Sequence, residues 1–299
     1  MTEDDLDAAD LVVRLAFGTF RDLADPAEAF GDADRVRTRF RAAPDCTWVA
    51  EADGNVVGAV FATRWGSFGY FGPLAVRPDH WDRGIGKRLL EPVVESFARW
   101  DLQQAGLFTF AESPKHLGLY QSRGFWPGQL VVIHAKPVSA DASGTYEPAS
   151  VHDIGEISVL TETVFDGLHI GREVAAVAEQ GLGQTLLLRR DGELSGVAVC
   201  HCGAGSEAGS ETCYVKFGAV APGERAADDF ESLLDACESF AAGSGLETLV
   251  AGVNAGRLGA YSRLLARGFR ADQIGVSMWL RPEAPNFDRP EHYVLDDLR

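Results

Sequence analysis

An internal repeat constrains the fold of this chain more than any other feature. Asp53-Gly54 joins two apolar segments, Thr47 to Glu51 and Val56 to Arg64, and Asp191-Gly192 joins Leu186 to Arg190 and Ser195 to Cys202 in the same way. Because Asp-Gly accepts the positive φ angles of a tight turn, each pair of segments is predicted to form a β-hairpin. The chain therefore contains the same supersecondary unit twice.

Two further landmarks extend the repeat beyond the hairpins. Val76-Arg77-Pro78 recurs 144 positions later as Val220-Ala221-Pro222, and Gly124-Phe125 recurs at the same offset as Gly268-Phe269. The two hairpin turns are only 138 positions apart, so the second copy holds six extra residues. The segment 203–210, rich in Gly and Ser, is predicted to absorb them as a flexible stretch.

Each copy is predicted to contain a helix, a hairpin, a long strand, a helix, a strand, a helix and a last strand. In the first copy, Thr2 is predicted to cap the first helix, and the last two strands are expected at Ala105 to Ala111 and Leu130 to Ala135. The second copy has room for an additional strand at about 144–147. We therefore predict two domains, residues 1–138 and 145–299.

Composition supports folded domains and excludes several kinds of partner. The chain has 299 residues, of which 46% are hydrophobic, and carries a net charge of −17; at roughly 150 residues a domain, two domains are expected. A strongly acidic surface repels the phosphate backbone of nucleic acids. The acidic N-terminal segment and the lack of a long apolar run predict no secretion signal and no membrane span. We expect a soluble, cytoplasmic protein.

The cysteines do not indicate a disulfide framework or a metal site. There are five of them, an odd number in a long chain, so reduced thiols are expected. Cys200-His201-Cys202 places the two thiols on one face of a strand and the imidazole on the other, which does not suit a shared ligand. We predict no metal.

The segment 74–90 is typical of an anion-binding strand, loop and helix. Gly84 and Gly86 lie where the loop enters the helix, and glycines there let phosphate oxygens approach the free amides of the first turn. Four basic residues surround them, namely Arg77, Arg83, Lys87 and Arg88. On an otherwise acidic protein, this segment is predicted to bind a pyrophosphate.

This segment resembles the acyl-CoA-binding signature of the GNAT superfamily of N-acyltransferases, Val-x-Pro followed by Gln/Arg-x-x-Gly-x-Gly/Ala. The later segment 116–125 is similar to the family's Leu-Tyr-x-x-x-Gly-Phe motif. With the repeat, the resemblance implies a tandem GNAT protein of mixed α/β (α+β) class. Each domain is then expected to be a twisted, mostly antiparallel sheet flanked by helices, with two splayed strands at its centre.

The resemblance implies that acetyl-CoA binds the first copy as acyl donor. The residues expected to contact it are Leu74, Ala75, Val76, Trp81, Asp82, Arg83, Gly84, Ile85, Gly86, Lys87, Arg88 and Ser113. In the family the pantetheine arm pairs with the strand before the loop, so Leu74 to Val76 should splay from Leu107 to Ala111. Trp81 departs from the family pattern, because Gln or Arg is usual there. Arg83 or a backbone amide is expected to replace that phosphate contact.

Tyr120 matches the usual general acid of the family, which protonates the leaving thiolate. Its phenol, with an ordinary pKa of about 10, is protonated at neutral pH and can donate. The alternative is a helix tyrosine that only packs against the core. For the base that deprotonates the amine, Glu112 and His116 are the nearby titratable residues, and the sequence does not choose between them.

The second copy is predicted to have lost the acyl-CoA site. At the offset of 144, Asp228 replaces Gly84, Phe230 replaces Gly86 and Leu264 replaces Tyr120. A carboxylate and a bulky ring would repel and obstruct phosphate. We expect this copy to be structural, as a wall of the acceptor site or an interface.

The sequence thus predicts an acetyl-CoA-dependent N-acetyltransferase that transfers the acyl group directly to a small amine. Two alternatives stay open: a non-catalytic acyl-CoA-binding or regulatory protein, and acetylation of a cysteinyl sugar as in the tandem mycothiol synthases. Acceptor contacts are expected from 25–41 and from the segment after Phe125. The excess of acidic residues suggests a cationic acceptor. A homodimer is left open.

Overall fold

The computed structural model describes residues 1–281, 283 and 286–299. The helices are α1 (Leu6–Phe20), α2 (Val36–Ala42), α3 (Ile85–Arg99), α4 (Pro114–Gln121), α5 (Ile154–Val164), α6 (Gly171–Gln180), α7 (Ala226–Gly243) and α8 (Leu258–Ala266). The strands are β1 (Thr47–Ala52), β2 (Asn55–Trp65), β3 (Phe68–Val76), β4 (Gln104–Thr109), β5 (Phe125–Pro137), β6 (Glu147–Pro148), β7 (Gly183–Arg190), β8 (Glu193–Gly203), β9 (Gly209–Val220), β10 (Thr248–Asn254), β11 (Arg270–Leu280) and β12 (Val294–Leu295).

Both predicted hairpins form. Asp53 and Gly54 connect β1 to β2 with φ angles of 51° and 73°, and Asp191 and Gly192 connect β7 to β8 with 54° and 86°. Two consecutive positive φ angles give the turn whose twist matches that of the flanking strands. At the N-terminus, the Thr2 amide and hydroxyl both donate to the Asp5 carboxylate, 2.6 and 2.9 Å away, just before α1 begins.

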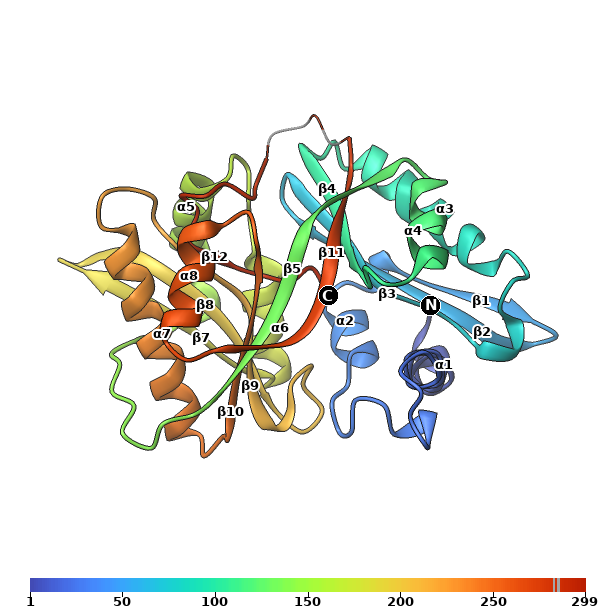
Figure 1. Cartoon of the computed structure of the whole chain (residues 1–299), viewed down its shortest axis with the longest axis horizontal. Coiled ribbons are helices and arrows are strands. Elements are labelled where there is room, and N and C mark those ends of the chain that lie inside the picture. Colours follow the sequence, from blue (N-terminus) through green and yellow to red (C-terminus); the bar gives the residue numbers. More distant parts are fainter. Residues whose placement is uncertain (282, 284–285) are drawn as a thin grey trace.

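The two halves share one continuous sheet and exchange their last strands. Over the described residues the strand order is β1-β2-β3-β4-β11-β5-β10-β9-β8-β7-β6, with β12 beside β9. The last strand of the first copy, β5, pairs with β10 of the second, and β11 of the second copy lies between β4 and β5. Figure 1 shows β5 and β11 side by side at the centre of the molecule. The halves are therefore joined by backbone hydrogen bonds.

Helices cover both faces of the sheet in each half. Side chains of α1 and α2 form one core with β2 and β3, and α3 and α4 form another with β3 and β4. In the second half, α7 and α8 cover one face and α5 and α6 the other. No helix in the described part of the chain is long and apolar enough to cross a bilayer.

A buried group of charges crosses from one half to the other. Arg39 of α2 lies 2.6 Å from Glu207, whose carboxylate is also 2.6 Å from Lys216. Lys216 in turn pairs with Glu173 at 2.9 Å, and Trp65 donates to Glu173 at 3.2 Å. A buried charge without its partner is strongly destabilising, so these contacts hold the two halves in one arrangement.

The six-residue insertion differs from the sequence prediction. The segment 203–210 was expected to be a flexible connection, but Glu207 within it is only 3% exposed and pairs with Arg39. Its flexible composition serves a turn that carries one carboxylate to the other half of the molecule. The composition correctly indicated a loop. It did not indicate that Glu207 would be buried, because its partner Arg39 lies 168 residues away in the sequence.

Candidate active site

The predicted splay between two central strands is present. Phe68 to Phe71 of β3 pair in parallel with Gln104 to Leu107 of β4, and there the pairing ends. Leu74 to Val76 remain paired with β2 on their other side, across a bulge at Val60/Ala62. Among the described residues, none pairs with Leu74 to Val76 on the β4 side. That edge therefore presents backbone groups that can accept an added, extended chain.

A cavity of about 500 Å³ opens at this edge. Ten of the twelve residues predicted to contact acetyl-CoA line it, namely Leu74, Ala75, Val76, Trp81, Asp82, Gly84, Ile85, Gly86, Lys87 and Ser113. Arg83 and Arg88 do not; both are exposed. Sequence reasoning missed Ala16, Phe17 and Phe20 of α1, which form the opposite wall. Apolar residues at helical spacing can face either a core or a cavity, so their spacing did not predict that they would line this cavity.

The loop into α3 has the geometry of an anion site. Gly84 precedes the helix with a φ of 78°, which an L side chain rarely adopts, and a Cβ built there would meet nothing within 4 Å. At Gly86 a Cβ would lie 3.4 Å from Leu119 Cδ2, on the side of the cavity. The first amides of α3 have no partner within the helix, and together they favour a bound anion.

Trp81, at the position where Gln or Arg is usual in the family, makes a hydrogen bond within its own loop. Its indole N–H donates to the Val76 carbonyl at 2.6 Å, so the ring packs along the loop. Lys115 lies 5.1 Å from the ring centroid and 2.8 Å from Asp82. The expected replacement, Arg83, lies outside the cavity lining, whereas Lys87 lies within it. Lys87 and the helix amides are the groups available for phosphate oxygens.

Tyr120 lies where the cavity ends. Tyr120 belongs to α4, and its side chain is buried against β3, with its ring centroid 5.6 Å from that of Phe71. Burial raises the pKa of its phenol to about 12, an effect that the Thr109 side chain partly offsets. The phenol is therefore protonated throughout the neutral range and able to donate. Tyr120 packs against the core and also lines the cavity, a location compatible with either of the two roles that the sequence leaves open.

The two candidates for the base lie differently. Glu112 is exposed and lines neither this cavity nor the one beyond it, although its charge is close enough to His116 to raise the pKa of that residue. His116 lines both, one turn before Tyr120, and its buried Nδ1 has no hydrogen-bond partner among the described residues. Burial and then the nearby Lys115 charge lower the pKa of His116. The neutral imidazole that results can accept a proton.

A second, smaller cavity of about 80 Å³ adjoins the first. Phe17, Leu74, Phe110, His116 and Tyr120 line both. The second is also lined by Phe30, Arg35 and Arg39, within the predicted acceptor segment 25–41. The segment directly after Phe125 does not line it. Gln273, Leu298 and Arg299 from the second half do, because β11 and the C-terminal residues cross into the first half.

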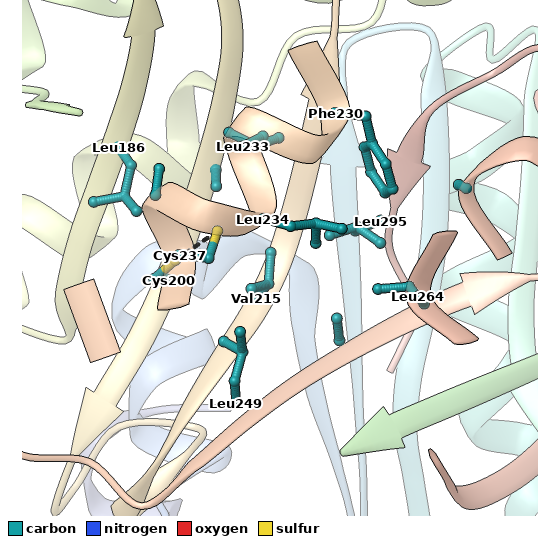
Figure 2. Close-up of a cluster of buried hydrophobic side chains, with 14 of the residues drawn as sticks. Leu186, Cys200, Val215, Phe230, Leu233, Leu234, Cys237, Leu249, Leu264 and Leu295 are labelled. Atoms are coloured by element: carbon teal, nitrogen blue, oxygen red, sulfur yellow. Dashed lines mark hydrogen bonds between the residues drawn. The ribbon is translucent and has the colours of Figure 1, made fainter. Parts of the chain in front are cut away.

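The matching region of the second half is filled by the chain itself. At the offset of 144, Leu74 and Ala75 correspond to Gly218 and Ala219 of β9, and these pair with Leu295 and Val294 of β12. β12 therefore occupies the free edge that β3 keeps. Figure 2 shows Leu295 between Phe230 and Leu264, the residues at the positions of Gly86 and Tyr120. All three side chains are fully buried.

Buried ion pairs anchor the residues around β12. Arg257, 1% exposed, lies 2.5 Å from Asp296 and 2.8 Å from Asp288, and it donates to the Val294 carbonyl at 3.2 Å. Asp228, predicted to repel phosphate, lies exposed in the first turn of α7. In the second half, the loss of both glycines, at Asp228 and Phe230, thus occurs together with the covering of the β9 edge by β12.

Comparison with known proteins agrees with this geometry. Residues 14–125 match the model of the acetyltransferase (GNAT) family, and no curated protein matches the sequence significantly. A putative acetyltransferase from Pyrococcus horikoshii shares the fold with a TM-score of 0.69 at 15% identity, over 98% of this chain and 91% of that one.

Two further solved structures are similar over most of their length. A GCN5-related N-acetyltransferase from Sphaerobacter thermophilus has a TM-score of 0.59 at 16% identity, over 95% of each chain. A tandem GNAT protein from the clavulanic acid biosynthesis pathway has 0.54 at 14%, over 91% of this chain and 96% of that one. At such identities these likenesses describe the fold alone. The match to the acetyltransferase (GNAT) family covers residues 14–125, and the solved structures show that the fold of nearly the whole chain is shared with acetyltransferases of this kind, a tandem GNAT protein among them.

Proposed function

We propose that this protein is an acetyl-CoA-dependent N-acetyltransferase whose single active site lies in the N-terminal half. One observation carries the proposal: a single cavity joins the splayed edge of β3, the glycine loop of α3, His116 and Tyr120. Each part suits one portion of the reaction, and the second cavity begins at the same two titratable residues. We keep the domain limits 1–138 and 145–299 as part of this proposal, with β5 and β11 exchanged between the domains.

The residues present fit acetyl-CoA, which supplies an activated acyl group as a thioester. Open space beside Gly84 and the amides at the start of α3 suit the pyrophosphate, and Lys87 adds a positive charge. Leu74 to Val76 offer the free edge for the pantetheine arm. Tyr120 and His116 then stand at the reacting end of the cavity, where the second cavity provides access for an acceptor.

In the proposed mechanism, His116 removes a proton from the acceptor ammonium and leaves a nucleophilic amine. As the amine nitrogen forms its bond to the acyl carbon and the carbon–sulfur bond breaks, Tyr120 donates its proton to the departing sulfur. The nitrogen then loses its extra proton to the Tyr120 phenolate, which leaves a neutral amide and restores the acid, and His116 releases its proton to solvent. The aromatic residues Phe17, Phe110 and Phe71 exclude water around these groups. A neutral base and a protonated acid are the forms that the surroundings of His116 and Tyr120 favour.

Measuring thiol release from acetyl-CoA with a panel of amines tests this function. Amine-dependent release with a matching acetylated product supports the enzyme. If the protein binds acetyl-CoA but no amine causes thiol release, the non-catalytic interpretation is favoured. The burial of Tyr120 is compatible with that interpretation as well. The cysteinyl-sugar reading loses support, because the working copy of that family is the C-terminal one and β12 covers the corresponding edge here.

The pH dependence of turnover tests the role of His116. Because the pKa of His116 lies below its ordinary value, its base form is already present in mildly acidic solution. We expect kcat/KM to rise with pH through an apparent pKa below about 6.5 and then to level off. In His116→Gln this rise should disappear and kcat should fall on the order of tenfold to a hundredfold. An unchanged profile in the variant would assign the base elsewhere. Glu95→Gln, at an exposed position of α3 outside both cavities, is the control and should leave both quantities unaffected.

A further inference from the structure

The second cavity is lined by positive charge. Arg21, Arg35, Arg39 and Arg299 line it, together with aromatic and aliphatic side chains. In the described part of the chain, no aspartate or glutamate does. This concentration of arginine is local, because the protein as a whole carries a net charge of −17. An excess of like charge in a partly apolar cavity is unfavourable unless an anion joins it.

Two of the four arginines are neutralised by acidic partners outside the cavity. Arg39 pairs with Glu207 at 2.6 Å, and it also donates to the backbone carbonyl of Gly72 and to the main-chain oxygen of Arg299, the last residue of the printed sequence, where that oxygen belongs to a carboxylate. Arg299 pairs with Asp297 at 2.9 Å and stacks 4.8 Å from the ring centroid of Tyr214. These contacts account for both charges without any ligand.

Arg35 has no such partner. Its guanidinium lies 4.3 Å from the ring centroid of Phe30, and it forms no hydrogen bond or ion pair with any described residue; its Nε is fully buried and unsatisfied. Burial, followed by the charge of Arg299, lowers the pKa of Arg35 to about 9. A buried guanidinium that has no hydrogen-bond acceptor and lies beside other positive charges is stabilised when an anion binds to it. Arg21 is exposed and lies at the edge of the same cavity.

This unpaired arginine lies next to the reacting groups. His116 and Tyr120 line both cavities, so a molecule in the second one can present an amine to the thioester end of the first. We propose that the acceptor is an amine that also carries a carboxylate, and that Arg35 binds this carboxylate in the second cavity. The proposal rests on the proposed acetyltransferase function and specifies its substrate class.

Size and charge favour a carboxylate over a larger or more highly charged anion. A volume of about 80 Å³ has room for roughly five to eight water-sized groups. One unpaired guanidinium inside the cavity matches a single negative charge, and its planar fork matches the two carboxylate oxygens. The lining by Phe30, Phe71 and Phe108 suits a short apolar side chain. These features favour an acceptor with a carboxylate over the purely cationic acceptor that the net charge suggested, because the unpaired guanidinium of Arg35 would repel a further positive charge.

Matched acceptors test the proposal without any variant. L-Leucine, L-leucinamide and 3-methylbutylamine share the side chain and differ in the carboxylate, and kcat/KM is compared per ammonium form, the form from which His116 is proposed to remove a proton. We expect kcat/KM for leucine to exceed the other two by roughly 10- to 100-fold, the range for a charge-assisted hydrogen-bonding pair. 2-Aminoethyl phosphate and β-alanine form a second pair. Preference for the phosphate, or no preference among the leucine set, would overturn the assignment.

A pair of variants locates the effect. Arg35→Gln should reduce the preference for the carboxylate, measured as the ratio of kcat/KM for leucine to kcat/KM for 3-methylbutylamine, to about one- to threefold. Arg41→Gln removes the same charge from α2 at an exposed position outside both cavities, and it should keep the wild-type preference. A preference that persists in a folded Arg35→Gln protein would contradict the role of Arg35.

The same ligands separate failure of this inference from failure of the proposed function. Binding of leucine, leucinamide and 3-methylbutylamine to the CoA-saturated protein is measured by calorimetry, which requires no turnover. If no amine releases thiol but leucine binds at least about tenfold more tightly than its amide, the acetyltransferase function fails and the carboxylate site stands. If amines are acetylated without discrimination, the function stands and the carboxylate site fails.

Discussion

Replacing Gly86 with phenylalanine is expected to abolish acetyl-CoA binding, with affinity reduced by at least about a hundredfold, or ~2.7 kcal/mol. A Cβ at Gly86 lies 3.4 Å from Leu119 Cδ2 and 3.8 Å from Leu74 Cδ2, so the ring must extend into the space between β3 and α4. The second half carries Phe230 at this position and is filled by Leu295. Titration calorimetry measures the effect directly.

The same titration counts the sites. Wild-type protein should bind one acetyl-CoA per chain, because β12 occupies the edge of β9 that would hold a second. Gly155→Phe is the matched control, since it adds the same ring at an exposed position of α5 with nothing within 4 Å of a Cβ. A stoichiometry of two would contradict the assignment of the second half, and unchanged affinity in a folded Gly86→Phe protein would contradict the site.

Replacing Tyr120 with phenylalanine is expected to lower kcat on the order of a hundredfold and to leave acetyl-CoA affinity almost unchanged. The substitution keeps the ring that packs against Phe71 and removes only the proton donor. Because the pKa of Tyr120 is raised to about 12, the wild-type enzyme should also retain its rate up to about pH 10. Single-turnover measurements separate this chemical step from product release.

Tyr261→Phe provides the control for this experiment. Tyr261 lies in α8 of the second half, one turn before Leu264, and packs 5.1 Å from the His134 ring. Removing its hydroxyl should not change kcat, because it lines neither cavity. Turnover of Tyr120→Phe at the wild-type rate, with chemistry rate-limiting, would leave Tyr120 as a packing residue.

Local features of the fold were predictable because they depend on neighbouring residues. The two Asp-Gly turns form as expected, since adjacent φ angles determine such a turn. Nine of the ten predicted acetyl-CoA contacts that line the cavity do so for a related reason: the strand, loop and helix of 74–90 are continuous in sequence. The repeat also identified Phe230 and Leu264 as residues of the second half that replace Gly86 and Tyr120. No contact across the chain was needed for that inference.

By itself the sequence determined the tandem repeat, the glycine loop and the position of Tyr120. Only the tertiary structure decided the strand exchange and the filling of the second half, because backbone hydrogen bonds between β5, β10 and β11, and between β12 and β9, leave no residue pattern. It also brought together the residues that line the second cavity. Arg35 and Arg299 are distant in sequence, and net charge sums over the whole surface, whereas binding depends on the charges that line one cavity.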